Sequence, residues 1–211
     1  MKELPTGKQN FEEIISKDLL YIDKTQQIYK LIKSGNLYFL SRPRRFGKSL
    51  LISTLKHIFE GQQAIFQNLY LGRETDYQFE GHPVLQFNFA KLGHRVENLE
   101  DALNSEIDKY TSSYKIEIDD SSLSTKLFSL VESIATKDKP VVILIDEYDK
   151  PIIDFLTEKK QAKINQEILR DFFSSLKDLD AQGYLHFLFI TGVSKFSKVS
   201  LFSDLNNLTD L

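Results

Sequence analysis

Three adjacent residues, Gly47, Lys48 and Ser49, form the first chemical signal in the chain. A glycine lets the backbone approach an anion, a lysine can reach the β- and γ-phosphates of a nucleotide, and a serine hydroxyl can bind Mg²⁺. The full phosphate-loop pattern also has a glycine five residues before Gly47, and Arg42 stands there instead. The triplet alone is therefore an incomplete signature of a triphosphate site.

A second signal lies much further along the chain. The aliphatic residues Val141–Ile145 lead directly into Asp146 and Glu147. A buried parallel strand that ends in acid places the acid where ligands bind in open α/β sheets. Asp146 can hold Mg²⁺ opposite Ser49, and Glu147 can orient and deprotonate an attacking water. The presence of both acids favours hydrolysis of the nucleotide over binding alone.

Two further groups could complete such a site. Thr191 follows the apolar run 185–190, and its hydroxyl is predicted to sense or hold the γ-phosphate or the water. An arginine would neutralise charge during phosphoryl transfer. Arg44, Arg45 or, from a neighbouring subunit, Arg170 could supply it, and the sequence does not choose among them.

Each of these residues also has a purely structural interpretation. Clustered arginines such as Arg42, Arg44 and Arg45 occur in solvated turns, and acids after a strand can cap a helix. Aromatic residues are ordinarily packing residues, although Phe11 or Tyr21 could stack on an adenine. The hydroxyl after the apolar run suits a structural and a functional role equally well.

The composition is that of a globular α/β protein. The 211 residues include 27 Lys and Arg against 30 Asp and Glu, and 41% are hydrophobic. The absence of cysteine excludes a disulfide framework, a thiol nucleophile and Cys-ligated metals, and the four histidines show no metal-ligand spacing. No secretory signal or membrane-spanning run is visible, so we expect a cytoplasmic protein without a membrane partner.

Positive charge is concentrated in the first part of the chain. Residues 1–60 hold 11 Lys and Arg against 6 Asp and Glu, whereas residues 61–211 hold 16 against 24. Four of the early cations fall within residues 42–48, which indicates a local anion site. DNA binding is possible but not indicated by the charge, because a DNA-binding surface spreads its cations along the phosphate backbone.

Apolar runs alternate with segments of helical spacing, which predicts βαβ units after a helical N-terminus. We expect strands at 37–40, 84–89, 141–145 and 185–190, and helices at 49–60, 96–110, 123–134 and 164–179. Gly61 is predicted to follow the first of these helices as its C-terminal glycine. No clear element is predicted beyond residue 193.

Several runs together resemble the AAA-ATPase-like family of bacterial and archaeal proteins, nearly end to end. These runs are LPTGKQNFEEI, YIDKT, YFLSRPRRFGKSLLISTL, VVILIDEYDKPI and FLFITGVSKFSKVSLFSDLNNL. The phosphate loop of that family itself reads RPRRFGKS, so Arg42 is similar to the family's own variant. The resemblance implies a P-loop NTPase fold, an α/β domain with a mostly parallel sheet in the order 5-1-4-3-2 and helices on both faces.

The resemblance also implies roles for individual residues. It assigns Asp146 to the metal ion together with Ser49, and Glu147 to the attacking water. It also assigns Gly47, Lys48 and Ser49 to the nucleotide loop. The full set of residues that we expect to bind the nucleotide is Pro43, Arg44, Arg45, Phe46, Gly47, Lys48, Ser49 and Leu50.

Members of the family commonly continue into a fifth strand, a helical lid region and a nuclease domain similar to restriction endonucleases. We therefore expect residues 1–211 to be a C-terminally truncated P-loop domain in which strand 5 and the lid are missing. A homo-oligomer or a separate C-terminal nuclease-like chain could supply the rest.

The sequence thus predicts an ATP-binding domain that uses Mg²⁺ to hydrolyse ATP and to drive a conformational change, with Lys48, Glu147 and Thr191 as catalytic residues. The alternative is a non-hydrolytic, nucleotide-dependent switch or scaffold, in a defence or mobile-element system or associated with DNA.

Overall fold

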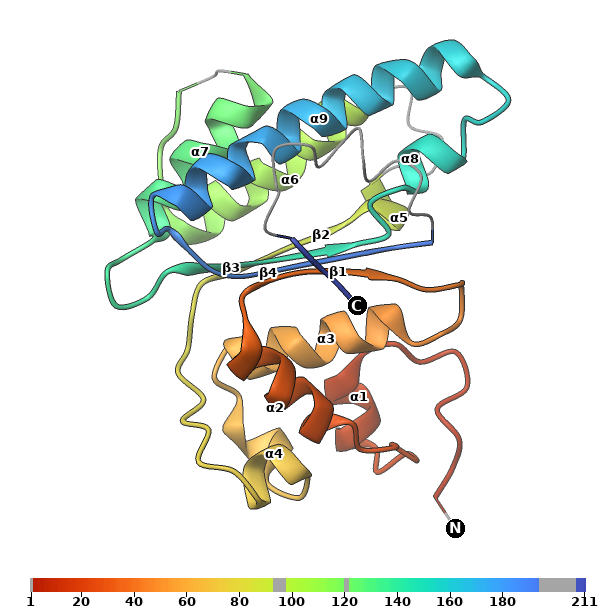
Figure 1. The fold of residues 1–211 in the computed structure, drawn as a ribbon, viewed down its shortest axis with the longest axis vertical. Helices are drawn as coiled ribbons and strands as arrows, with labels where there is room; N and C mark the ends of the chain where they lie inside the picture. The colour runs from red at the N-terminus through yellow and green to blue at the C-terminus, as the bar shows by residue number, and fades with distance from the viewer. Residues whose placement is uncertain (1, 93–97, 120–121, 194–207) are drawn as a thin grey trace.

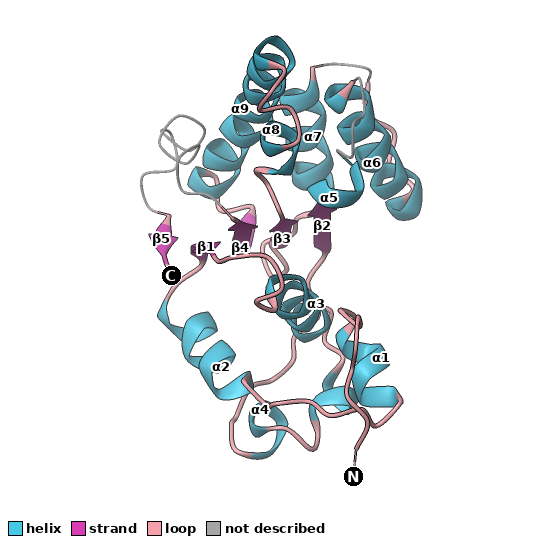
Figure 2. Ribbon diagram, turned by 90° about the vertical axis from the view of Figure 1, so that its right-hand side faces the viewer, coloured by secondary structure: helices cyan, strands magenta, loops and turns pink. Residues whose placement is uncertain are grey.

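The chain folds around one parallel sheet, as a computed structural model of residues 2–92, 98–119, 122–193 and 208–211 shows. The order of its five strands is β2-β3-β4-β1-β5, and every neighbouring pair is parallel (Figure 2). The strands are β1 (Leu37–Ser41), β2 (Val84–Asn88), β3 (Val141–Asp146), β4 (Leu185–Gly192) and β5 (Thr209–Asp210). Read from the other side, this is the predicted order 5-1-4-3-2.

Helices cover both faces of the sheet (Figure 1). One face carries α6 (Leu99–Tyr114), α7 (Leu123–Ile134) and α9 (Lys159–Ala181), and short α5 (Phe89–Leu92) and α8 (Lys150–Ile153) follow β2 and β3. The other face carries α1 (Phe11–Ser16), α2 (Thr25–Ser34), α3 (Lys48–Phe59), the 3₁₀ turn η1 (Gln63–Phe66) and α4 (Tyr70–Arg73). Each layer of helices encloses its own apolar cluster against the sheet.

Central strand β3 is buried along its whole length, which explains its unbroken aliphatic sequence. Residues 141, 143 and 145 point into the cluster under α6, α7 and α9, and residues 142 and 144 into the cluster over α3. The strand extends one residue further than predicted, so Asp146 is its last residue.

Helix α3 follows the predicted pattern closely. It begins at Lys48 and ends at Phe59, and Gly61 comes after the C-cap with φ +77°. A side chain at Gly61 would bring a Cβ within 2.8 Å of the Phe79 carbonyl oxygen, so both the left-handed backbone and the close approach require glycine.

The prediction that strand 5 is missing is wrong. Thr209 and Asp210 pair with Tyr38 and Phe39 of β1 at the edge of the sheet, and Leu211 N donates to Phe39 O over 3.0 Å. A two-residue strand leaves no periodic signal, because alternation needs at least four residues to be seen. Residues 96 and 97 of the predicted helix and residues 194–207 of the predicted irregular tail lie outside the described part of the chain.

Candidate functional site

The carboxyl ends of β1, β2, β3 and β4 meet at one edge of the sheet, on the right in Figure 1. In the ladders Asn88 is opposite Asp146, and Ser41 is opposite Gly192. The loop after β1 therefore starts beside the end of β4, which in turn lies beside the end of β3. This is the edge at which ligands bind in open α/β sheets.

The loop between β1 and α3 is exposed and contains two residues with left-handed backbone. Arg45 has φ +68° and Gly47 has φ +76°. A glycine adopts this conformation at no cost, whereas an arginine pays about 1–2 kcal/mol in local strain. At its start the loop is tied to the sheet by Arg42 N, which donates to Gly192 O over 3.1 Å.

Lys48 is a buried cation at the base of this loop. Its residue is only 4% exposed, and its ammonium donates to the carbonyl oxygens of Arg42 at 3.0 Å and Pro43 at 3.1 Å. Within the described residues no carboxylate pairs with it. Since buried charges are normally paired, this lysine suits a site that receives an anion.

Asp146 is the matching buried anion. The residue is 1% exposed, Thr191 Oγ1 donates to its Oδ1 over 2.7 Å, and Asn88 Nδ2 donates to its Oδ2 over 3.4 Å. Both donors are neutral, and no cation among the residues that the structure describes forms an ion pair with this carboxylate. Carboxylate oxygen is the ligand that Mg²⁺ prefers, so the site fits a divalent cation.

Glu147 has an unusual backbone for a glutamate, with φ +54°. Its N–H donates to Thr191 Oγ1 over 3.2 Å, and the next N–H, of Tyr148, donates to Thr191 O over 3.0 Å. Residues held in sparsely populated conformations cost about 1–3 kcal/mol and cluster at functional sites. The half-buried Glu147 is thus fixed at the strand end by β4.

A short path of contacts connects the lysine to the acids. Lys48 binds the Arg42 carbonyl, Arg42 N binds Gly192 O, and Thr191, the neighbour of Gly192, binds Asp146. The structure therefore brings Lys48 and the two acids, which are the two predicted halves of the site, to the same edge of the sheet. The roles of the individual side chains stay predictions.

Gly192 allows Tyr148 to pack beside these residues. A Cβ on Gly192 would lie 2.3 Å from Tyr148 Cε1 and 3.2 Å from Asp149 Oδ1. Asp149 in turn accepts a hydrogen bond from Val193 N over 2.9 Å. The segment after the acids is thereby locked against the end of β4.

A cleft of about 750 Å³ opens beside the loop between β1 and α3. Arg42, Phe46, Gly47 and Lys48 are among the residues that line it. Its other walls are mostly apolar and come from the N-terminal segment, α2 and α3, with Leu4, Ile22 and Leu211 among the exposed hydrophobic residues that line it.

The two aromatic residues considered for adenine differ. Phe11 is fully buried and stacks on Phe66 with ring centroids 4.8 Å apart, so it is a packing residue, as expected of most aromatic side chains, and not the one that could stack on a base. Tyr21 lines the cleft. Burial raises the pKa of its phenol to about 12, which keeps the hydroxyl neutral at physiological pH.

The remaining predicted residues occupy three environments. Pro43, Arg44 and Arg45 are exposed on the loop, whereas Ser49 and Leu50 are half-buried in the first turn of α3. Arg170 is exposed on α9, in the layer of helices on the other face of the sheet.

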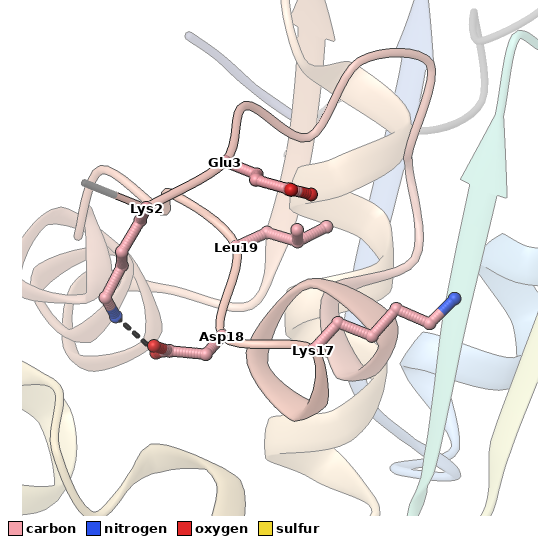
Figure 3. A pocket seen from close by; sticks show the side chains of 5 residues that line it. All are labelled: Lys2, Glu3, Lys17, Asp18 and Leu19. Atoms are coloured by element: carbon pink, nitrogen blue, oxygen red, sulfur yellow. Dashed lines mark ion pairs between the residues drawn. The ribbon is translucent and has the colours of Figure 1, made fainter.

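A second hollow, of about 350 Å³, lies among Lys2, Glu3, Lys17, Asp18 and Leu19 (Figure 3). Its lysines already have carboxylate partners: Lys2 pairs with Asp18 at 2.5 Å, and Lys17 pairs with Glu13 at 2.7 Å. Because its cations are compensated and exposed, this hollow lacks the feature that marks Lys48 as an anion site.

Sequence reasoning missed Asn88 and the apolar wall of the cleft. Asn88 ends an alternating strand, and a polar residue at that position is a usable signal once the strand is known to neighbour β3. The wall from the N-terminal segment carried no such signal, because scattered residues such as Leu4 and Ile22 show no periodicity.

Comparison with known proteins gives a consistent result. A family model described as a predicted AAA-ATPase matches residues 5–202. A protein of Azotobacter chroococcum mcd 1, described as "Uncharacterized protein in vnfD 5'region", is 40% identical over 215 residues that cover 100% of this chain. The chain spans 41% of the length of that relative. No solved structure matches the chain.

None of the helices within the described ranges has the length and apolarity needed to cross a bilayer.

Proposed function

Because the chain belongs to the AAA-ATPase-like family, we propose that it binds ATP with Mg²⁺ at the carboxyl edge of its sheet and hydrolyses the nucleotide. The family suggests ATP binding; Mg²⁺ dependence, hydrolysis and a conformational change driven by it are the further steps of the proposal. A homo-oligomer, a nuclease-like chain and DNA stay predictions as partners.

The observation that carries the proposal is the buried ammonium of Lys48. Its only bonds within the described chain go to two neutral carbonyl oxygens of its own loop, Arg42 O and Pro43 O. Lys48 is only 4% exposed, and a buried cation is stabilised by an anion. In P-loop proteins, the loop in front of the corresponding helix binds a phosphate.

The shape of the cleft supports a nucleotide rather than free phosphate. A nucleotide has an anionic end and an apolar, planar end, and the cleft offers lining residues of both kinds. Lys48 and other residues of the loop before α3 line the cleft together with apolar side chains such as Leu51 and Ile28. Apolar walls with few polar groups are typical of small-molecule sites of this size.

The chain's own residues then have distinct roles in the proposed reaction. Asp146 and Ser49 would hold Mg²⁺, which when bound neutralises charge on the phosphates. Lys48 would stabilise charge that develops on the transferred phosphoryl group, and Glu147 would take the proton of the attacking water. The rigid backbone around Glu147 keeps its carboxylate near the strand end from which it must act.

The test compares Lys48→Ala and Glu147→Gln with the wild type. We expect Lys48→Ala to lose ATP binding, and Glu147→Gln to bind ATP but release phosphate at least about a hundredfold more slowly. Lys56→Ala is the matched control, because Lys56 lies on the same helix and forms only a partly exposed pair with Glu60 at 3.7 Å.

Binding of ATP by Lys48→Ala as tight as by the wild type would contradict the proposal. ATP binding without any phosphate release by the wild type would contradict hydrolysis and support the nucleotide-dependent switch instead. Equal losses in Lys56→Ala and Lys48→Ala would show that the assay reports general damage to α3.

A further inference from the structure

Asp146 is held from both sides by its neighbouring strands. Its Oδ1 accepts a hydrogen bond from Thr191 of β4 and its Oδ2 accepts one from Asn88 of β2. The two strands flank β3 in the sheet, so the carboxylate is fixed in the plane between them. Each oxygen keeps further lone pairs for another ligand.

The hydroxyl of Thr191 already has two protein partners. It donates to Asp146 Oδ1 at 2.7 Å and accepts from Glu147 N at 3.2 Å, and the residue is completely buried. A hydroxyl has a single hydrogen, so Thr191 could donate to a phosphate or a water only by releasing Asp146.

The amide of Asn88 is anchored at its other end. Asn88 Oδ1 accepts from Lys91 N over 3.1 Å in the turn where β2 passes directly into α5. This bond sets which end of the amide faces Asp146, so the Nδ2 group is presented to the carboxylate. The backbone ladder places the two residues opposite each other.

We propose that Thr191 and Asn88 are positioning residues that orient the Asp146 carboxylate for Mg²⁺, and that neither of them contacts the nucleotide. The inference rests on the proposed function. It assigns Thr191 to the support of the metal ligand and of the Glu147 peptide, in place of the predicted contact with the γ-phosphate or the water. Partners that orient metal ligands typically change metal affinity about 10- to 100-fold when removed.

The experiment separates metal binding from nucleotide binding. The affinity for a fluorescent ATP analogue is measured in EDTA and then during titration with Mg²⁺, for the wild type, Thr191→Val, Thr191→Ser and Asn88→Ala. Thr191→Val keeps the shape of the side chain and removes the hydroxyl. We expect it to leave the affinity in EDTA within about twofold and to raise the half-saturating Mg²⁺ concentration about tenfold.

The other variants refine the result. Thr191→Ser retains the hydroxyl and should restore the Mg²⁺ dependence of the wild type. Asn88→Ala should shift the Mg²⁺ midpoint about threefold, since its 3.4 Å bond is longer and weaker. Ser175→Ala, which removes a buried hydroxyl that donates to Phe172 O within α9, is the matched control and should change neither affinity.

The outcomes are distinguishable. If Thr191→Val and Asn88→Ala titrate with Mg²⁺ as the wild type does, or if Thr191→Val weakens binding equally in EDTA and in Mg²⁺, the positioning role is wrong while ATP binding stands. If the wild type binds no ATP analogue, both proposals fall. Should Thr191→Val not fold, Asn88→Ala carries the same test, because its side chain is only half-buried.

Discussion

The two edges of the sheet hold different kinds of polar cluster. At the carboxyl edge, Asp146 and Lys48 are buried charges without ionic partners in the described chain, and Glu147 has left-handed backbone. At the amino edge, His82 and His186 stack on each other with ring centroids 3.9 Å apart, and the ring of Phe59 stands edge-on to both. One cluster contains buried charges and a left-handed backbone, and the other consists of stacked and edge-on rings.

The difference separates function from stability. His82 Nδ1 donates a hydrogen bond to the Pro140 carbonyl oxygen over 3.0 Å, and both imidazoles otherwise serve as flat rings against Phe59. A ring cluster of this kind stabilises a fold through buried area. An uncompensated buried charge destabilises it unless a ligand arrives, so only the carboxyl edge has a physical need for one.

The largest expected effect is on the amino edge. Phe59→Ala removes a fully buried ring that also packs against Phe187, with the two ring centroids 4.8 Å apart. It should lower the free energy of unfolding by about 4 kcal/mol. Urea denaturation measures the loss. The fraction that stays folded should bind ATP with unchanged affinity, and a loss of affinity in that fraction would mean that the two edges are coupled.

Gly192→Ala should have the next largest effect, and it should change both the stability of the fold and the candidate site. Its Cβ would overlap Tyr148, whose neighbour is Glu147, and relief of the overlap should cost about 2–3 kcal/mol. Urea denaturation measures the loss of stability, and the rate of phosphate release measures the effect on the site. Gly81→Ala is the control, because the nearest atom to its Cβ is at an ordinary 3.5 Å. Full activity of Gly192→Ala would show that Tyr148 can move without disturbing Glu147.

The sequence predicted the sheet better than the layers around it. The positions of the four longer strands and the bounds of α3 followed from apolar runs and from Gly61, because buried strands and capped helices leave dense local patterns. The strand order was implied by the family resemblance alone. Helices α5 and α8, with four residues each, were not predicted, since they are too short to show a period. Strand β5 was missed for the same reason.

For the site, the sequence predicted the edge and the main groups but not the contacts between them. Lys48 and Asp146 could be predicted as site residues because each belongs to a motif next to a strand. The hydrogen bonds of Asp146 to Asn88 and Thr191 depend on strand order and register, which join residues distant in the chain. Left-handed backbone at Glu147 also has no signature in residue type, because glutamate rarely adopts it.

The amino edge should make stability sensitive to acid. Burial, and then the neighbouring His82, lower the pKa of His186 from 6.5 to about 4, while Glu80 opposes the shift. The unfolded chain therefore binds a proton that the folded chain rejects, and stability is lost as the pH falls from 6.5 towards 4. Because the ring is partly open to water, we expect a loss of only about 1–2 kcal/mol.

His186→Phe isolates this contribution from the titration of carboxylates, which both proteins share. The loss of unfolding free energy between pH 7 and pH 4 should be smaller in the variant by that same amount of about 1–2 kcal/mol. Parallel pH curves for the two proteins would show that His186 does not titrate differently on folding.

The smallest effect should come from the strained loop at the carboxyl edge. Arg45→Gly relieves about 1–2 kcal/mol of left-handed strain but adds about 0.5–1 kcal/mol of freedom to the unfolded chain, so a net gain of about 0.5 kcal/mol is expected. Arg44→Gly is the matched control: it is equally exposed, and without strain to relieve it should lose about 0.5–1 kcal/mol. Urea denaturation without nucleotide measures both. Equal changes in the two variants would mean that the loop relaxes in solution and that strain at this edge is confined to Glu147, where the hydrogen bonds of β4 impose it.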